Sequence, residues 1–149
     1  MRRVIAATAT ILLGSSLLVA EKKPYPLFTP GDFVASMQAL GRNFTAVNSL
    51  IATGDYDSAK QQLARSREIL ATTISYWRDR DRNDAIKMLR DGVAKMDALD
   101  AVLSLEKVDP GSAAGAARQV ASACQSCHAA YREQNAKTGT YTFKKGSGQ

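Results

Sequence analysis

Residues 29–54 read TPGDFVASMQALGRNFTAVNSLIATG, a pattern typical of one amphipathic helix. Thr29 suits the N-cap, Pro30 suits the first helical position, and Asp32 completes a capping box of the S/T-x-x-D kind. Apolar residues then recur every three or four positions up to Gly54, a typical helix end. They are Phe33, Met37, Leu40, Phe44, Val47 and Ile51. The segment therefore predicts a long helix with one apolar stripe.

Two further helices are expected after this one. The first covers about residues 57–78, with inward positions at Leu63, Leu70, Ile74 and Trp77. The charged run at 78–82 predicts a solvated turn, and the next helix covers about residues 83–105. Within that helix Gly92 is a weak position, because glycine is a poor helix former.

A fourth helix is expected after the turn Asp109-Pro110-Gly111-Ser112, and it runs to about Asn135. Its inward residues are mostly small: Ala113, Ala117, Val120, Cys124, Cys127 and Tyr131. The polar tail that follows has no helical period, although the alternation at 140–143 predicts either a short strand or no fixed structure. Four helices with short connections and no persuasive sheet predict an all-α fold, an antiparallel four-helix bundle.

Both cysteines and the only histidine of the chain lie in the segment Cys124-Gln125-Ser126-Cys127-His128. C-x-x-C-H is the arrangement that attaches a c-type haem. The two thiols share one helix face, where each can add to a vinyl group of the haem. His128 stays on that face as the proximal ligand of the iron, and the small residues around it leave space for the flat macrocycle. One covalently attached haem c on the last helix is therefore expected.

Three other interpretations of this segment compete with haem attachment. A thioredoxin-like redox pair uses C-x-x-C in a βαβ context, which the pattern lacks. A zinc site needs four ligands, so carboxylates or water would have to complete it. A disulfide across so short a span would strain a helix.

Residues 1–20 have the pattern of a secretory signal peptide. Arg2 and Arg3 precede an uncharged run that ends at Leu18-Val19-Ala20, where Leu18 makes the cleavage site imperfect. An uncleaved membrane anchor is the competing interpretation, although the run is short for a stable span. Because covalent haem attachment takes place outside the bacterial inner membrane, a periplasmic location is expected.

The remaining residues, 21–149, are enough for one domain, divided here into a haem domain at 21–136 and a polar tail at 137–149. Without residues 1–20 the chain has 18 basic and 14 acidic residues, a net charge of +4. The basic residues alternate with acidic ones and show no aromatic stacking pattern, so no nucleic-acid binding is expected. The expected partner is a redox protein, and the positive charge favours an acidic one. Membrane contact is expected only if the N-terminal segment is retained, and a homodimer is left open.

Any second protein ligand of the usual kind must lie upstream of the motif, because only 21 residues follow His128 and none of them is Met or His. The candidates are Met37, Met88 and Met96. A thioether opposite an imidazole favours reduced iron and suits electron transfer. No nucleophile or acid/base cluster stands out near the motif, so no enzymatic turnover is expected.

With these residues in view, the chain resembles the class II cytochromes c, the family of cytochrome c prime and cytochrome c556. The resemblance is carried by CQSCHAAYR at 124–132 and MQALGRNF at 37–44, and it covers about residues 30–135. Members of this family are four-helix bundles with the haem motif on the last helix. The chain departs from the family at Phe33, where many members have a basic residue that interacts with the haem.

The resemblance implies a role for Met37, which stands four residues before Gly41. In cytochrome c556 a methionine at this place closes the sixth coordination position of the iron. In cytochrome c prime an apolar residue there leaves the iron open to nitric oxide or carbon monoxide. Arg42 and Arg132 are candidates for contacts with a haem propionate or the proximal imidazole, and otherwise belong to a solvated helix face.

The expected function is therefore a periplasmic electron carrier with His128 and Met37 as axial ligands. The alternative is a five-coordinate haem protein of the cytochrome c prime kind that binds nitric oxide or carbon monoxide. A third interpretation, a membrane-tethered subunit of a larger oxidoreductase, requires that the segment after Arg2 and Arg3 be retained as an anchor.

Overall fold

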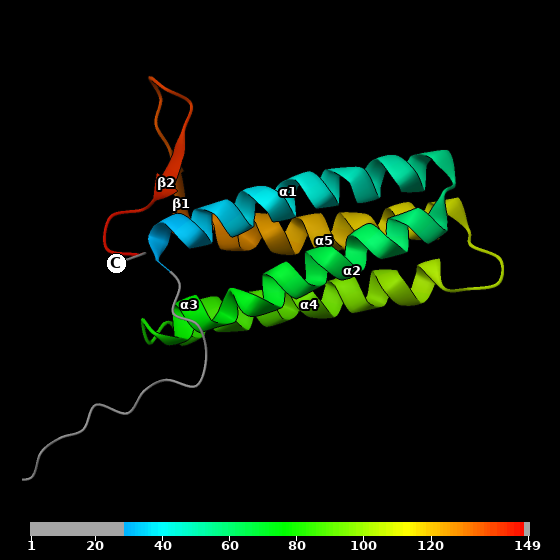
Figure 1. Ribbon diagram of the computed structural model, residues 1–149, viewed down its shortest axis with the longest axis horizontal. Coiled ribbons are helices and arrows are strands. Elements are labelled where there is room, and N and C mark those ends of the chain that lie inside the picture. The colour runs from blue at the N-terminus through cyan, green and yellow to red at the C-terminus, as the bar shows by residue number, and fades with distance from the viewer. Residues whose placement is uncertain (1–28, 148–149) are drawn as a thin grey trace, which may run out of the picture.

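The computed structural model describes residues 29–147, and these form an almost entirely helical molecule (Figure 1). Its helices are α1 (Pro30–Thr53), α2 (Tyr56–Thr72), α3 (Ile74–Arg78), α4 (Asn83–Leu103) and α5 (Pro110–Tyr131), and its strands are β1 (Arg132–Gln134) and β2 (Tyr141–Phe143). The expected all-α class is confirmed. The signal or anchor segment expected at 1–20 lies outside the described residues. No helix within 29–147 is both long enough and apolar enough to cross a membrane.

Helix α1 begins and ends where the sequence predicts. The Thr29 hydroxyl accepts the Asp32 N–H at 3.1 Å, and the Asp32 carboxylate accepts the Thr29 N–H at 3.0 Å, which completes the capping box. Gly54 ends the helix in the left-handed region at φ 78°, where glycine avoids the Cβ clash. Four residues of the apolar stripe are buried: Phe33, Leu40, Val47 and Ile51. Met37 and Phe44 are only partly buried, because they line a cavity.

The single helix expected over 57–78 is interrupted at Thr73, which separates α2 from α3. Hydroxyl groups here bond to carbonyls three residues earlier: Thr72 to Ile69 at 2.8 Å and Thr73 to Leu70 at 2.7 Å. Such local side-chain bonds compete with the regular helical pattern, and β-branched threonines are weak helix formers. The interruption is followed by the buried residues Tyr76 and Trp77.

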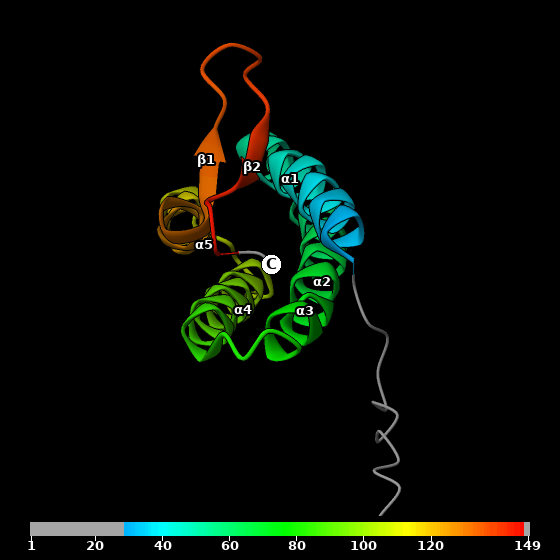
Figure 2. The same cartoon turned by 90° about the vertical axis from the view of Figure 1, so that its left-hand side faces the viewer.

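The four long helices lie side by side, and the loops between them are short (Figures 1 and 2). Helix α1 packs mainly on α2, α2 also packs on α4, and α4 packs on α5, whereas α1 and α5 contact each other more sparsely. Helix α4 continues through Gly92, where a Cβ atom would lie 3.1 Å from the Leu70 side chain. The position predicted to be weak is therefore a close approach between α2 and α4.

Helix α5 ends at Tyr131, before the predicted end at Asn135, because the chain turns into a β-hairpin. Arg132 is extended, with φ −115° and ψ 137°, so it does not continue the helix one turn beyond His128. The strands β1 and β2 are antiparallel, with Arg132 opposite Phe143. Of the two outcomes expected for 140–143, the structure has the strand. The hairpin stands between α5 and α1 at one end of the molecule (Figure 2).

Phe143 joins the hairpin to the core. Its ring lies 5.4 Å from that of Phe33, 5.7 Å from that of Tyr76 and 5.8 Å from that of Trp77, measured between centroids. Buried aromatic contacts of this kind stabilise packing beyond their apolar area alone. Part of the segment predicted as a polar tail therefore belongs to the folded body.

Candidate functional site

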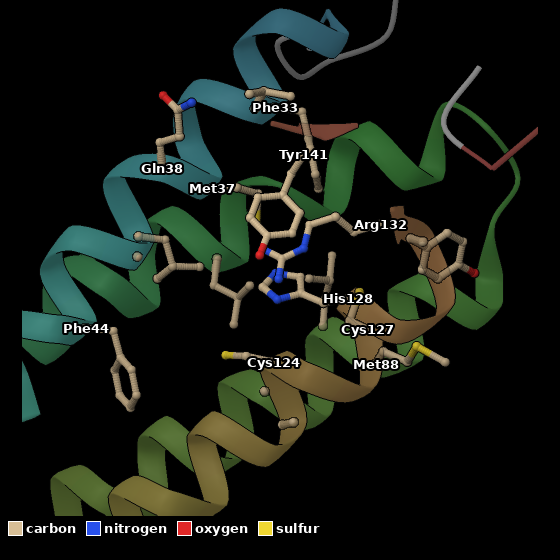
Figure 3. Close-up of a pocket in the computed structure, with 18 of the residues that line it drawn as sticks. Phe33, Met37, Gln38, Phe44, Met88, Cys124, Cys127, His128, Arg132 and Tyr141 are labelled. Atoms are coloured by element: carbon tan, nitrogen blue, oxygen red, sulfur yellow. The ribbon is translucent and has the colours of Figure 1, made fainter. Parts of the chain in front are cut away.

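A cavity of about 580 Å³ lies between α1, α4, α5 and the hairpin (Figure 3). Cofactor and ligand sites in proteins typically enclose about 300–1,000 Å³ and have mostly apolar walls. The walls here are apolar and aromatic side chains, including Phe33, Leu40, Phe44, Leu70 and Leu89. The contact between α1 and α5 is sparse beside this space. Of the small inward residues expected on α5, Cys124 and Cys127 line the cavity, whereas Ala113, Ala117 and Val120 are buried in the core away from it.

The C-terminal half of α5 carries the three residues of the predicted haem motif to this cavity. Cys124, Cys127 and His128 all line it, and each is partly buried. Both cysteines are free thiols. Within residues 29–147 no three His, Cys, Asp or Glu side chains are arranged to hold a metal ion, so these three side chains do not converge on one point. The arrangement gives no support to a zinc site, and the βαβ surroundings of a thioredoxin-like pair do not occur among the described elements.

The electrostatics of the motif follow from its burial. Burial raises the pKa of the Cys124 thiol, and it raises the pKa of Cys127 to about 11. Burial, and then the positive charge of Arg132, lowers the pKa of the His128 imidazole. At neutral pH the site therefore holds two S–H groups and an uncharged imidazole, whose free nitrogen lone pair can bind a metal. Reactive redox dithiols depend instead on a lowered thiol pKa.

All three candidate methionines line the cavity, but from different helices. Met37 points into it from α1, across the cavity from α5 (Figure 3), whereas Met88 lines it from α4. Met96, also on α4, is fully buried in the core. Met37 is the candidate whose helix faces His128 across the cavity.

The two candidate arginines differ in position. Arg132 lines the cavity, where its guanidinium carbon lies 3.9 Å from the centroid of the Tyr141 ring. Its charge is close enough to His128 to lower the pKa of the imidazole. Arg42 is exposed on α1 and is not among the residues that line the cavity. The structure therefore brings Arg132 to the site and leaves Arg42 outside it.

Trp77 is a site residue that the sequence analysis missed, since it predicted only that the side chain points inward. The indole is 1% exposed and lines the cavity, and its Nε1–H has no hydrogen-bond partner within the described residues. A buried donor without an acceptor costs about 1–3 kcal/mol. A bound group with carboxylate oxygens, such as haem with its propionates, would supply that acceptor. The residues present therefore fit such a group.

A network of polar side chains connects three segments of the chain next to the motif. The Tyr131 hydroxyl donates to the Asp84 carboxylate, and Arg82 donates to the same carboxylate at 3.3 Å and to the Tyr131 oxygen at 3.1 Å. Arg82 also donates to the carbonyl of Ser147, with a distance of 3.5 Å. These bonds join the start of α4, the end of α5 and the chain after the hairpin. The sequence offers no pattern that would have identified them.

No family model matches the chain, and neither a curated protein nor a solved structure matches it. The interpretation of the site therefore depends on its own residues and their arrangement.

Proposed function

We propose that this protein is a periplasmic c-type cytochrome that carries single electrons on one covalently bound haem. The observation that supports this most is that Cys124, Cys127 and His128 all line one apolar cavity of cofactor size, with Met37 pointing into it from the facing helix (Figure 3). If the C-x-x-C-H motif had arisen by chance, its three side chains would not be expected to line a cavity of this size.

The proposed architecture is an antiparallel four-helix bundle of the class II cytochrome c kind, with the haem on the last helix. The packing of α1 on α2, of α2 on α4 and of α4 on α5 is what such a bundle requires. In this architecture α2 and α3 together form the second helix of the bundle, which is interrupted at Thr73.

Each residue of the site has a distinct role in this proposal. Cys124 and Cys127 would hold the haem covalently through their sulfur atoms. His128 would bind the iron through its imidazole nitrogen, and Met37 would bind it through its thioether sulfur. When bound, the haem supplies a one-electron couple, and a neutral thioether ligand favours the reduced state.

The rest of the cavity positions the haem and excludes water. The Trp77 N–H and the Arg132 guanidinium are donors suited to the propionate carboxylates. The apolar walls keep the local dielectric low, which strengthens these contacts. Residues 21–149 have 18 basic and 14 acidic residues, a net charge of +4, which favours an acidic protein as the redox partner.

Covalent attachment is tested by expressing the chain in a bacterium with a haem-attachment system and staining denaturing gels for haem. The unmodified protein should keep its haem after denaturation, and a double variant with Cys124→Ser and Cys127→Ser should lose it. Ser126→Ala is the matched control, because Ser126 lies between the two cysteines, is exposed and does not line the cavity. Unmodified protein without haem would overturn the proposal.

A further inference from the structure

The hairpin of residues 132–143 forms a wall of the cavity that no helix of the bundle supplies. Thr140, Tyr141, Thr142 and Phe143 all line the cavity. Figure 3 shows the Tyr141 ring pointing into the cavity. The side chain is also 50% exposed, so Tyr141 stands at the mouth, between the cavity and solvent.

The base of this hairpin is fixed to the body of the molecule. Phe143 packs in the aromatic cluster described above, and the Lys144 N–H donates to the Tyr131 carbonyl at 2.9 Å. The Lys144 ammonium group donates to the carbonyl of Ala129 at 2.5 Å. Tyr141 is two residues from Phe143 on the same strand, so its backbone has little freedom to move away.

The Tyr141 ring is also held from within the hairpin. Arg132 lies over the ring, an arrangement in which the cation is attracted by the aromatic face. The loop of the hairpin is closed by the Asn135 N–H, which donates to the Thr140 carbonyl at 2.8 Å. Gln134, the residue opposite Tyr141 in the strand register, donates from its side chain to the Gly139 carbonyl at 3.0 Å.

We propose that Tyr141 is a specificity-determining residue of the site, which limits by size the small molecules that reach the iron when Met37 is not bound to it. This inference rests on the proposed haem function and assigns the regulation of access to that same site. An aromatic ring at the entrance of a cavity discriminates between entering molecules by their width, through steric exclusion, and not by their charge. Truncation of the ring should therefore favour large ligands far more than small ones.

The test measures ligand association rates in haem-loaded protein that carries Met37→Ala, so that the proposed distal ligand is absent. The ligands are carbon monoxide and a series of alkyl isocyanides from methyl to tert-butyl, followed by absorption after flash photolysis. Tyr141→Ala should raise the rate for tert-butyl isocyanide by about tenfold or more, since pockets discriminate by that much per methylene. The rate for carbon monoxide should change by less than about twofold.

Two variants serve as controls for this effect. Tyr141→Phe keeps the ring and removes only the hydroxyl, so it should behave like the parent. Lys137→Ala changes an exposed residue at the tip of the same hairpin that does not line the cavity, so it should also behave like the parent. Tyr141→Leu provides a second truncation if the alanine variant loads haem poorly.

Rates that are unchanged by Tyr141→Ala, or raised equally for every ligand, would overturn the role of Tyr141. The second result would mean general loosening of the fold. Haem staining of each preparation separates these outcomes from failure of the proposed function. Protein without haem contradicts the cytochrome proposal itself, whereas haem-loaded protein with unchanged size selectivity contradicts only this inference.

Discussion

At the scale of single residues, the proposed function depends on side chains that line one cavity from two helices. Cys124, Cys127 and His128 come from one stretch of α5, and Met37 comes from α1. Burial keeps the imidazole neutral and the thiols protonated at physiological pH. In the proposed site, Met37 is the side chain that decides whether the sixth position of the iron is closed.

Replacement of Met37 by alanine should open the iron to carbon monoxide, because the thioether that occupies the sixth position is removed. The reduced variant should shift its absorption bands on addition of the gas, and the unmodified protein should not. Met88→Ala is the matched control, because Met88 lines the same cavity from α4. If only the Met88 variant responded to carbon monoxide, Met88 on α4 would be the distal ligand, and the assignment of Met37 would be wrong.

Replacement of Trp77 by phenylalanine keeps an aromatic ring in the core and removes the indole N–H. If that N–H donates to a propionate, the propionate bending band in the resonance Raman spectrum of the haem-loaded protein should shift. Trp77 has no other acceptor within residues 29–147, so the change removes no hydrogen bond of the polypeptide itself. An unchanged Raman band would show that the indole does not contact the carboxylate.

The sequence predicted these residues unequally, for a physical reason. The motif at 124–128 is local, so its spacing on a helix was enough to bring its three side chains to one face. Trp77 and Tyr141 reach the cavity only through the packing of distant segments, which periodicity does not describe. Arg132 was expected one helical turn beyond His128, but it reaches the cavity because α5 ends and the chain becomes a strand.

At the scale of elements, local signals predicted the helix ends that are capped by short-range bonds. The capping box of α1 and the left-handed Gly54 are both complete within a few residues, and both were read from the sequence. The interruption at Thr73 goes with local hydroxyl bonds that hydrophobic periodicity does not reveal, and the early end of α5 goes with the packing of Phe143 in the core. The sequence therefore predicted one helix in place of α2 and α3.

Replacement of Thr29 by alanine should destabilise the protein by about 1 kcal/mol, because the side-chain half of the capping box is lost. The measurement is the free energy of unfolding in urea. Ser49→Ala, at an exposed position near the other end of α1, is the control, and it should change the free energy by less than about 0.5 kcal/mol. Equal effects of the two changes would argue against the cap as a source of stability.

At the scale of the whole molecule, the network of Asp84, Tyr131 and Arg82 joins segments that are far apart in the chain. Hydrogen bonds from Arg82, and then from Tyr131, hold the pKa of Asp84 well below its usual value. A carboxyl group whose folded-state pKa is lowered adds stability above its unfolded pKa, about 3.9. That stability is lost as the pH falls from there toward the folded-state pKa.

Replacement of Asp84 by asparagine should therefore reduce the loss of stability in acid. The free energy of unfolding of the unmodified protein, measured in urea, should fall steeply below about pH 5, and that of the variant should depend less on pH. Asp91→Asn, which changes an exposed carboxylate elsewhere on α4, should keep the full pH dependence. Parallel pH profiles for the unmodified protein and the Asp84 variant would exclude this network as the cause.

The absorption spectrum of the haem-loaded protein, oxidised and reduced, with and without carbon monoxide, tests the central claim most directly. An electron carrier with His128 and Met37 as ligands should give a low-spin reduced spectrum with a sharp alpha band. It should show a sulfur-to-iron band when oxidised and no response to the gas. A broad high-spin spectrum that shifts with carbon monoxide would contradict the account and favour the gas-binding alternative, and a protein without haem absorption would contradict both.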